Sequence, residues 1–394
     1  MSRSPAAPSR RLDQLSGYAF DELDKLRDAR RSAGVDVIDF GVGDPTEPTP
    51  EVVVAAARAG LETHRRAGYP AYNGSARFRE AVAAWFGRRH GVELDPAAEV
   101  TSTVGSKEAV FHLPAAFVDP GDVVLVPSPG YPPYGRGTLM AGGRVATYAV
   151  SSEGPVVPDL DALPADVQEA LRVVWITQPH VPTGRAAPRE ELERLARQCR
   201  ERGALLCSDE AYSELWMDAP PVSALEVARE GVLVVQSLSK RAAMTGYRVG
   251  FVAGDPAAVE TFRRLKVNID SGTPDFIQDA AVAALEDEQA PADARAAYKA
   301  RADALLPALQ RLGCRAERPE AGFYLWVGTP DAVPGVDFAR RLLGEAPGLA
   351  VMPGEWLADP VEGVARQPGD GLVRFALVPS LERCQEAADR LARW

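Results

Sequence analysis

The feature that most constrains the fold is an alternation of short apolar runs with helical segments through the middle of the chain. The runs occupy residues 100–104, 123–126, 173–176, 205–208, 232–235 and 249–253. Glycine- and proline-rich turns and segments with helical periodicity separate them. Strands that alternate with helices build a mainly parallel sheet with helices on both faces. The sequence therefore predicts an α/β fold in which a mainly parallel sheet is sandwiched by helices.

The regions on either side have a different character. Ahead of the alternation we predict helices at about residues 12–33, 51–63 and 76–89, with a short strand at 37–40. After it come amphipathic helices at 276–287 and 292–312 and strand-like runs at 322–327, 349–352 and 373–378. These elements predict a second, smaller α+β domain. We divide the chain into an N-terminal arm with part of the small domain (1–45), a large domain (46–285) and a small C-terminal domain (286–394).

The composition argues against several classes of protein. The net charge of −11 disfavours nucleic acid as a partner, because phosphate binding needs a basic surface. There is no run of about 18 apolar residues, so we expect no membrane span. Residues 1–11 lack the apolar core of a signal peptide, and we predict a disordered lead-in there. The four cysteines show no Cys-x-x-Cys spacing, so we expect no metal site, no disulfide framework and a cytoplasmic location.

A lysine follows the predicted strand at residues 232–235, in the segment Ser237-Leu-Ser239-Lys240. Arg248 lies eight residues further on, and with the two serines it would suit an anionic group near the lysine amine. An amine beside a phosphate site indicates a carbonyl cofactor held as a Schiff base. A single lysine in this position is also compatible with an ordinary solvated surface residue.

The Ser237-x-x-Lys240 spacing also matches the Ser-x-x-Lys motif of serine β-lactamases and penicillin-binding proteins. That interpretation requires Ser-Asp-Asn and Lys-Thr-Gly elsewhere in the chain. Neither tripeptide occurs in this sequence. A serine hydrolase is therefore disfavoured.

Other polar segments also come directly after predicted strands. They are residues 105–107, 130–134, 180–184 and 209–212. The carboxyl ends of parallel strands meet at one edge of an open sheet, where ligands bind. We therefore expect these segments and Lys240 to converge on one site.

With these motifs in this order, the chain resembles the fold-type I pyridoxal-phosphate enzymes, specifically the class I and II aminotransferases, from about residue 36 to 394. Ser-Lys-Arg-Ala-Ala-Met-Thr-Gly-Tyr-Arg at 239–248 and Lys-Val-Asn-Ile-Asp-Ser-Gly-Thr-Pro-Asp at 266–275 are most similar to the branch of succinyl-diaminopimelate and LL-diaminopimelate aminotransferases. The resemblance implies pyridoxal phosphate as the cofactor. It also implies a homodimer with shared active sites.

The resemblance assigns roles to residues that match the family's motifs. Lys240 is similar to the Schiff-base lysine, which also moves the substrate proton. Asp209 matches the carboxylate that keeps the pyridine nitrogen protonated through a charge-assisted hydrogen bond. Tyr212 matches the phenol that hydrogen-bonds the ring hydroxyl oxygen, and Tyr131 is similar to the aromatic residue stacked on the ring.

Further residues correspond to the phosphate and substrate contacts of the family. Ser106 and Lys107 resemble its phosphate loop at a helix N-terminus. The resemblance also implies that Arg374 grips the substrate α-carboxylate and that Gly43 lies in the loop closing over it. His180, in the cofactor loop, is a candidate substrate contact. The remaining phosphate ligands implied are Ser237, Ser239, Arg248 and, from a neighbouring subunit, Tyr69.

One position departs from the family pattern. The family's loop usually reads Asn-Pro-Thr-Gly, whereas this chain has Val181-Pro182-Thr183-Gly184. The asparagine donates a hydrogen bond to the ring oxygen of the cofactor, and valine cannot. Losing a donor to a charged oxygen costs about 1.5–3 kcal/mol of interaction. We expect this loss to raise the pKa of the Schiff base on Lys240, while Tyr212 maintains cofactor binding.

Three functions follow from these observations. The first is an aminotransferase that moves an amino group from an α-amino acid to a keto acid through Lys240. The second is a lyase of specialised metabolism, acting by β-elimination, C–S cleavage or decarboxylation-linked deamination, which Val181 favours because it changes electron demand at the ring. The third is a non-catalytic regulator, which the retention of Lys240, Asp209 and Arg374 disfavours. We predict the aminotransferase; the sequence leaves its amino acid, acceptor and pathway open.

Overall fold

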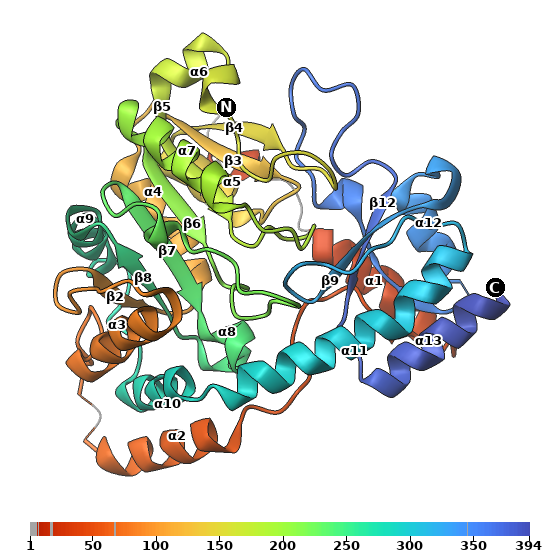
Figure 1. Cartoon of the computed structure of the whole chain (residues 1–394), viewed down its shortest axis with the longest axis horizontal. Coiled ribbons are helices and arrows are strands. Elements are labelled where there is room, and N and C mark those ends of the chain that lie inside the picture. The colour runs from red at the N-terminus through yellow and green to blue at the C-terminus, as the bar shows by residue number, and fades with distance from the viewer. Residues whose placement is uncertain (1–5, 7, 16–18, 67, 345) are drawn as a thin grey trace.

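The computed structural model describes residues 6, 8–15, 19–66, 68–344 and 346–394 (Figure 1). The lead-in predicted at residues 1–11 lies partly outside the described residues. Residues 16–18 of the helix predicted at 12–33 also lie outside them. Helix α1 covers Ala19–Ser32, and the 3-10 helix η1 covers Leu12–Gln14. The backbone is extended at Leu15 (φ −82°, ψ 114°), so the predicted helix does not run unbroken from residue 12.

The central feature of the described residues is a seven-stranded sheet with the order β2-β8-β7-β6-β5-β3-β4. All neighbouring pairs are parallel except those made by β8, which runs antiparallel to β2 and β7. The predicted mainly parallel sheet is confirmed. The strands are β2 (Val100–Thr103), β3 (Val123–Ser128), β4 (Arg144–Ala149), β5 (Leu171–Thr177), β6 (Leu205–Asp209), β7 (Val232–Ser237) and β8 (Gly250–Gly254).

Strand β4 was not predicted. It lies at the edge of the sheet, and most of its residues are exposed or half-buried, so it carries no continuous apolar run. At the other end of the sheet, Gly250 of β8 pairs with both Thr103 and Ser237. The carboxyl ends of β2 and β7 therefore lie at the same edge, although β8 separates the two strands.

Helices cover both faces of the sheet (Figure 1). Alternate residues of β7 enter different cores, as the period of a strand requires. Val232 and Val234 belong to a core with residues of α3, α7 and α10, and Leu233 and Val235 to one with α4 and α9. The helices are α2 (Glu51–Thr63), α3 (Ala76–His90), α4 (Ser106–Phe117), α5 (Pro133–Ala141), α6 (Ala165–Ala170), α7 (Arg189–Glu201), α8 (Leu238–Arg241), α9 (Pro256–Lys266) and α10 (Asp275–Glu286).

A smaller α+β region follows helix α11 (Gln289–Arg311), which runs from beside α8 to pack against α13 (Leu381–Arg393) (Figure 1). In the described residues its sheet has the order β11-β12-β9 and is antiparallel. Those strands are β9 (Tyr324–Gly328), β11 (Met352–Pro353) and β12 (Leu372–Ala376), with α12 (Gly335–Leu342) between β9 and β11.

The run at 349–352 was predicted as one strand, and this prediction is wrong. It forms two strands in different sheets, β10 (Leu349–Ala350) and β11. Strand β10 pairs in parallel with β1 (Ile38–Asp39), which ties the N-terminal segment to the smaller region. The 3-10 helices after η1 are η2 (Leu160–Ala162), η3 (Ala224–Glu226), η4 (Thr245–Tyr247), η5 (Pro330–Ala332) and η6 (Gly354–Trp356).

Across the described ranges, no helix is both long enough and apolar enough to cross a membrane. The same residues contain no group of three or more His, Cys, Asp or Glu side chains placed to hold a metal ion. All four cysteines are free and buried.

Candidate active site

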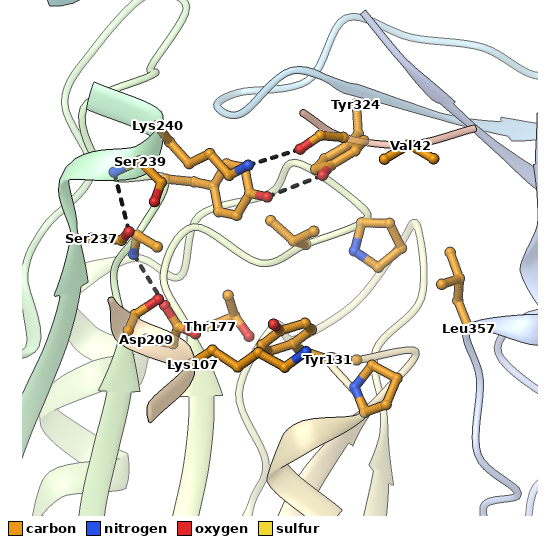
Figure 2. A pocket seen from close by; sticks show the side chains of 18 of the residues that line it. Val42, Lys107, Tyr131, Thr177, Asp209, Ser237, Ser239, Lys240, Tyr324 and Leu357 are labelled. Atoms are coloured by element: carbon orange, nitrogen blue, oxygen red, sulfur yellow. Dashed lines mark hydrogen bonds between the residues drawn. The ribbon is translucent and has the colours of Figure 1, made fainter. Parts of the chain in front are cut away.

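A cavity of about 440 Å³ lies between the carboxyl edge of the central sheet and the small sheet (Figure 2). Strands β6 and β7 contribute their last residues from one side, and β9 and β12 contribute Tyr324 and Arg374 from the other. Every predicted site residue except Tyr69 and His180 lines this cavity: Gly43, Ser106, Lys107, Tyr131, Val181, Asp209, Tyr212, Ser237, Ser239, Lys240, Arg248 and Arg374.

Lys240 lies on the short helix α8, directly after β7, and its amine reaches into the cavity. The Nζ donates a hydrogen bond to the carbonyl of Gly43 at 2.7 Å and lies 5.4 Å from the ring centroid of Phe323. Burial lowers the pKa of Lys240 to about 8, against the attraction of Asp44. A lysine with this pKa is partly neutral near physiological pH and can act as a nucleophile.

Asp209 is the last residue of strand β6. Its side chain is buried and lines the cavity. Its carboxylate accepts hydrogen bonds from the Tyr134 hydroxyl at 2.9 Å and from the Ala211 N–H at 3.1 Å. Burial raises the pKa of Asp209 to about 6, while these two donors oppose the rise. The group is therefore an anion at neutral pH, suited to hold a protonated ring nitrogen.

Tyr134 lies in the segment 130–134 that was expected at the site, but no individual role was predicted for it. It lies three residues after Tyr131 at the start of α5, and the two rings are 5.8 Å apart. Its place directly after strand β3, at the carboxyl edge of the sheet, was the available signal. Its hydroxyl fixes the orientation of the Asp209 carboxylate.

The end of the cavity near β7 carries the groups that suit an anion. Ser106 and Lys107 occupy the first turn of the 12-residue helix α4, where backbone N–H groups are unpaired within the helix. The Ser237 hydroxyl accepts from the Ser239 N–H at 3.2 Å. A Cβ at position 105 would overlap the guanidinium of Arg248, so the glycine there (φ +75°) lets this cation approach the helix N-terminus.

Tyr212, Tyr324 and Arg374 form the wall of the cavity on the side of the small sheet. The two tyrosine hydroxyls are 3.0 Å apart, and the Arg374 guanidinium lies 4.4 Å from the Tyr324 ring centroid. Arg374 also donates to the carbonyl of Gly41 at 2.8 Å and is only 5% exposed. A largely desolvated guanidinium binds a carboxylate strongly and in a fixed orientation.

No role in the site was predicted for Tyr324 from the sequence. Arg374 pairs across the small sheet with Trp326, and Ala376 pairs with Tyr324. Tyr324 is therefore a diagonal neighbour of Arg374 on one face of the sheet. Only the register of this strand pair places the two side chains together.

Comparison with known proteins identifies the family. Residues 35–391 match the family aminotransferase class I and II. The chain is a class I and II aminotransferase. It is 39% identical to the LL-diaminopimelate aminotransferase of Syntrophobacter fumaroxidans, with 97% of each chain covered. It is 41% identical to that of Desulforudis audaxviator, covering 97% of this chain and 96% of the relative.

Solved structures of related enzymes share the fold. An aminotransferase from Neisseria meningitidis superposes with a TM-score of 0.90 at 29% identity, covering 98% of this chain and 99% of the other. A probable N-succinyldiaminopimelate aminotransferase from Thermus thermophilus gives 0.87 at 30% identity, covering 95% and 99%. The predicted fold type, pyridoxal-phosphate dependence and amino-group transfer are confirmed.

The residues of the aminotransferase fit pyridoxal phosphate chemically. The cavity lining combines an amine that can form an imine, Lys240, with a carboxylate for the ring nitrogen, Asp209, and an anion-binding helix end. Figure 2 shows Lys240, Ser237 and Asp209 on the same side of the cavity. The glycine at position 105 leaves room for the Arg248 guanidinium beside the N-terminus of α4. A cation and a helix N-terminus together suit a phosphate dianion.

His180 was predicted as a candidate substrate contact in the aminotransferase, and this prediction is wrong. The side chain is fully buried and outside the cavity lining. Its Nε2 donates to the Pro129 carbonyl at 3.1 Å, so its Nδ1 accepts from the Thr183 hydroxyl at 2.9 Å. Burial lowers the pKa of His180 to about 4, which keeps it neutral. It links the turn after β3 to the loop that carries Val181.

Tyr69 lies outside the cavity of its own chain and is 86% exposed. Its predicted role requires a neighbouring subunit and stays a prediction. Val181 lines the cavity as expected and also packs against the core of the smaller region. Its side chain presents methyl groups where a donor was expected from the family pattern.

Gly43 leads to a prediction of stability. A Cβ there would overlap the Tyr324 hydroxyl and lie 2.7 Å from the ring carbon Cζ. The Gly43→Ala variant should therefore lose about 1–3 kcal/mol of unfolding free energy through overpacking, measured by urea titration. It should also disturb the Gly43 carbonyl that binds Lys240.

Gly87→Ala is the matched control, because a Cβ at this exposed position of α3 meets no atom within 4 Å. It should leave stability unchanged or raise it by up to about 1 kcal/mol. Equal stability of the two variants would contradict the steric role of Tyr324.

Proposed function

We propose that Lys240 carries the cofactor and moves the proton of an L-α-amino acid whose α-carboxylate Arg374 binds. The observation that carries this proposal is the placement of a buried, partly neutral amine and a buried guanidinium around one cavity. Pyridoxal phosphate, when bound, withdraws electrons from the substrate α-carbon. The Lys240 amine, released when the substrate amine replaces it, would take the α-proton, because it lies in the cavity and is not fully protonated.

The other residues bind and orient. Asp209 keeps a proton on the pyridine nitrogen, with Tyr134 holding the carboxylate in place. Both Tyr212 and Tyr131 line the cavity, where Tyr212 would donate its hydroxyl hydrogen to the ring oxygen and Tyr131 would stack on the ring. The phosphate-binding groups are Ser106, Lys107, Ser237, Ser239 and Arg248.

The substrate side chain, in this proposal, extends toward Val42 and Leu357. Figure 2 shows these residues on the side of the cavity opposite Ser237 and Asp209. Asp24 of α1 also lines the cavity, and its carboxylate pairs with Arg27 at 2.6 Å. LL-diaminopimelate, the substrate named for the relatives, is the first amino donor to test. The apolar surface suits its methylene chain, and the Asp24–Arg27 ion pair carries a charge complementary to each of the two groups at its distal end, an ammonium and a carboxylate.

We further propose a homodimer in which Tyr69 reaches the phosphate site of the neighbouring subunit. Its 86% exposure in one chain supports this arrangement. The division into 1–45, 46–285 and 286–394 is retained as a proposal, supported by the pairing of β1 with β10. The free, buried cysteines support a reducing compartment such as the cytoplasm.

The decisive experiment mixes holoenzyme with single amino acids, including LL-diaminopimelate, in the absence of any keto acid. Accumulation of pyridoxamine phosphate with an equal amount of keto acid, measured by mass spectrometry, is the expected result. Retention of pyridoxal phosphate with continuous release of ammonia, carbon dioxide or a thiol would instead indicate the lyase chemistry that Val181 favours. Reaction of apolar amino acids alone would overturn the LL-diaminopimelate proposal.

A further inference from the structure

The hydroxyl of Tyr212, which we propose as a donor to the cofactor's ring oxygen, is also hydrogen-bonded to the hydroxyl of a second tyrosine, Tyr324. The hydroxyls of Tyr212 and Tyr324 are 3.0 Å apart, and their ring centroids are 5.7 Å apart. Both residues line the cavity, one from the turn after β6 and the other from β9. The pair therefore links the large and small sheets through one hydrogen bond.

The direction of this hydrogen bond follows from what the cavity holds. Burial, together with the neighbouring Tyr324 hydroxyl, raises the pKa of Tyr212 well above its usual value, so this residue keeps its proton. When an anionic ring oxygen is present, the Tyr212 hydrogen points toward it. The Tyr212 oxygen is then left as an acceptor, and Tyr324 becomes the donor.

The surroundings of Tyr324 make it a good donor. The Arg374 guanidinium lies 4.4 Å from its ring centroid, and a cation in that position stabilises negative charge developing on the phenol oxygen. The Gly43 backbone passes so close that a Cβ there would overlap this hydroxyl. The Tyr324 side chain is therefore confined between Arg374 and the loop that accepts the Lys240 hydrogen bond.

Val181 offers the ring oxygen no hydrogen-bond donor from the other loop. We infer that Tyr324 is a positioning residue that polarises Tyr212 and so strengthens the hydrogen bond from Tyr212 to the cofactor's ring oxygen. Hydrogen bonds in a chain strengthen one another, and their effect is larger in a low-dielectric site. The inference rests on the proposed role of Tyr212.

The test is a pH titration of the cofactor's visible absorbance in the holoenzyme. A stronger hydrogen bond to the anionic ring oxygen favours loss of the imine proton, so it lowers the pKa of the absorbance change. Tyr324→Phe keeps the ring and removes the hydroxyl, and we expect this pKa to rise by about half a unit. The charged groups facing the pair, Arg374, Asp209 and Lys240, remain in this variant.

Tyr298→Phe is the matched control. Tyr298 belongs to the same core as Tyr324 and packs on Phe323 at 5.0 Å, but its hydroxyl faces Glu47 at 3.4 Å. Losing this hydroxyl should leave the titration as in the unmodified enzyme. A Tyr324→Phe titration that coincides with that of Tyr298→Phe would overturn the inference.

Val181→Asn supplies a direct donor and provides an independent check. This substitution should lower the pKa of the absorbance change by about 1–2 units. In the Val181→Asn background, Tyr324→Phe should have a smaller effect, because the amide then shares the stabilisation of the oxygen. Full additivity of the two substitutions would count against the relay. Absence of any cofactor absorbance in the unmodified enzyme would instead overturn the proposed function, and the relay with it.

Discussion

Replacing Lys240 with alanine is expected to reduce amino-group transfer by at least about 10⁴-fold. In the proposed mechanism, the substitution removes both the amine that binds the cofactor and the group that moves the substrate proton. The Lys240 Nζ lies 2.7 Å from the Gly43 carbonyl, whereas Lys107, which also lines the cavity, comes from the first turn of α4. The measurement is single-turnover formation of keto acid from the best amino donor.

A second measurement tests whether Lys240 is the residue that carries the cofactor. Borohydride reduction should attach the cofactor to the unmodified enzyme, and intact-mass measurement should show no such attachment in Lys240→Ala. Lys299→Ala is the control, because this lysine is 40% exposed and pairs with Asp218 at 3.0 Å. It should keep both activity and attachment. Attachment of the cofactor to Lys240→Ala would show that another residue carries it.

Asp209→Asn is expected to reduce turnover by about 10²–10³-fold, measured as kcat/KM. Asparagine nearly keeps the shape of the side chain but removes the charge that holds a proton on the pyridine nitrogen. The cavity should bind the cofactor more weakly, and dialysis should remove it faster. Asp218→Asn is the charge-matched control, because its carboxylate is 76% exposed and remote from the cavity lining. Equal activity of the two variants would exclude the proposed role of Asp209.

The same substitution should act in the opposite direction on the cofactor-free protein. Burial raises the pKa of Asp209 from 3.8 to about 6, so its folded state holds the proton more tightly than the unfolded state. The stability contributed by this group is present below pH 3.8 and is lost as the pH rises through about 6, a difference of about 3 kcal/mol. Asp209→Asn apoprotein should therefore melt at a higher temperature than unmodified apoprotein at pH 8, in differential scanning calorimetry. A lower melting temperature at pH 8 would contradict the direction of the pKa shift.

The sequence alone determined that the chain forms a mainly parallel sheet, six of its seven strands and the residues that follow them. Apolar runs such as 232–235 predict buried strands because burial on two faces requires consecutive apolar side chains. Lys240 and Asp209 follow directly after such runs, so their place at the carboxyl edge needed no knowledge of tertiary contacts. The helix predicted at 51–63 has the observed bounds of α2, Glu51–Thr63, because its pattern and the proline before it are local signals.

Other features were decided by the tertiary structure. Strand β4 could not be predicted from a run of apolar residues, because it lies at the edge of the sheet and most of its residues are exposed or half-buried. The run at 349–352 divides between two sheets because its first residues pair with β1 and its last residue pairs with β12. His180 was predicted from its place in a loop, but its surroundings come from the turn after β3, about fifty residues earlier.

The contacts between side chains in the cavity are the features that the sequence could not predict. Asp209 meets Tyr134, and Tyr212 meets Tyr324 across 112 positions of the chain. Hydrophobic periodicity is a property of consecutive residues, so the sequence reports it directly. Distances between remote side chains depend on strand order, on register and on how the two sheets pack, and a one-residue slip in register turns a side chain to the other face. The place of Lys240 and Asp209 at the sheet edge was therefore evident from the sequence, whereas the contact between Tyr212 and Tyr324 required the folded structure.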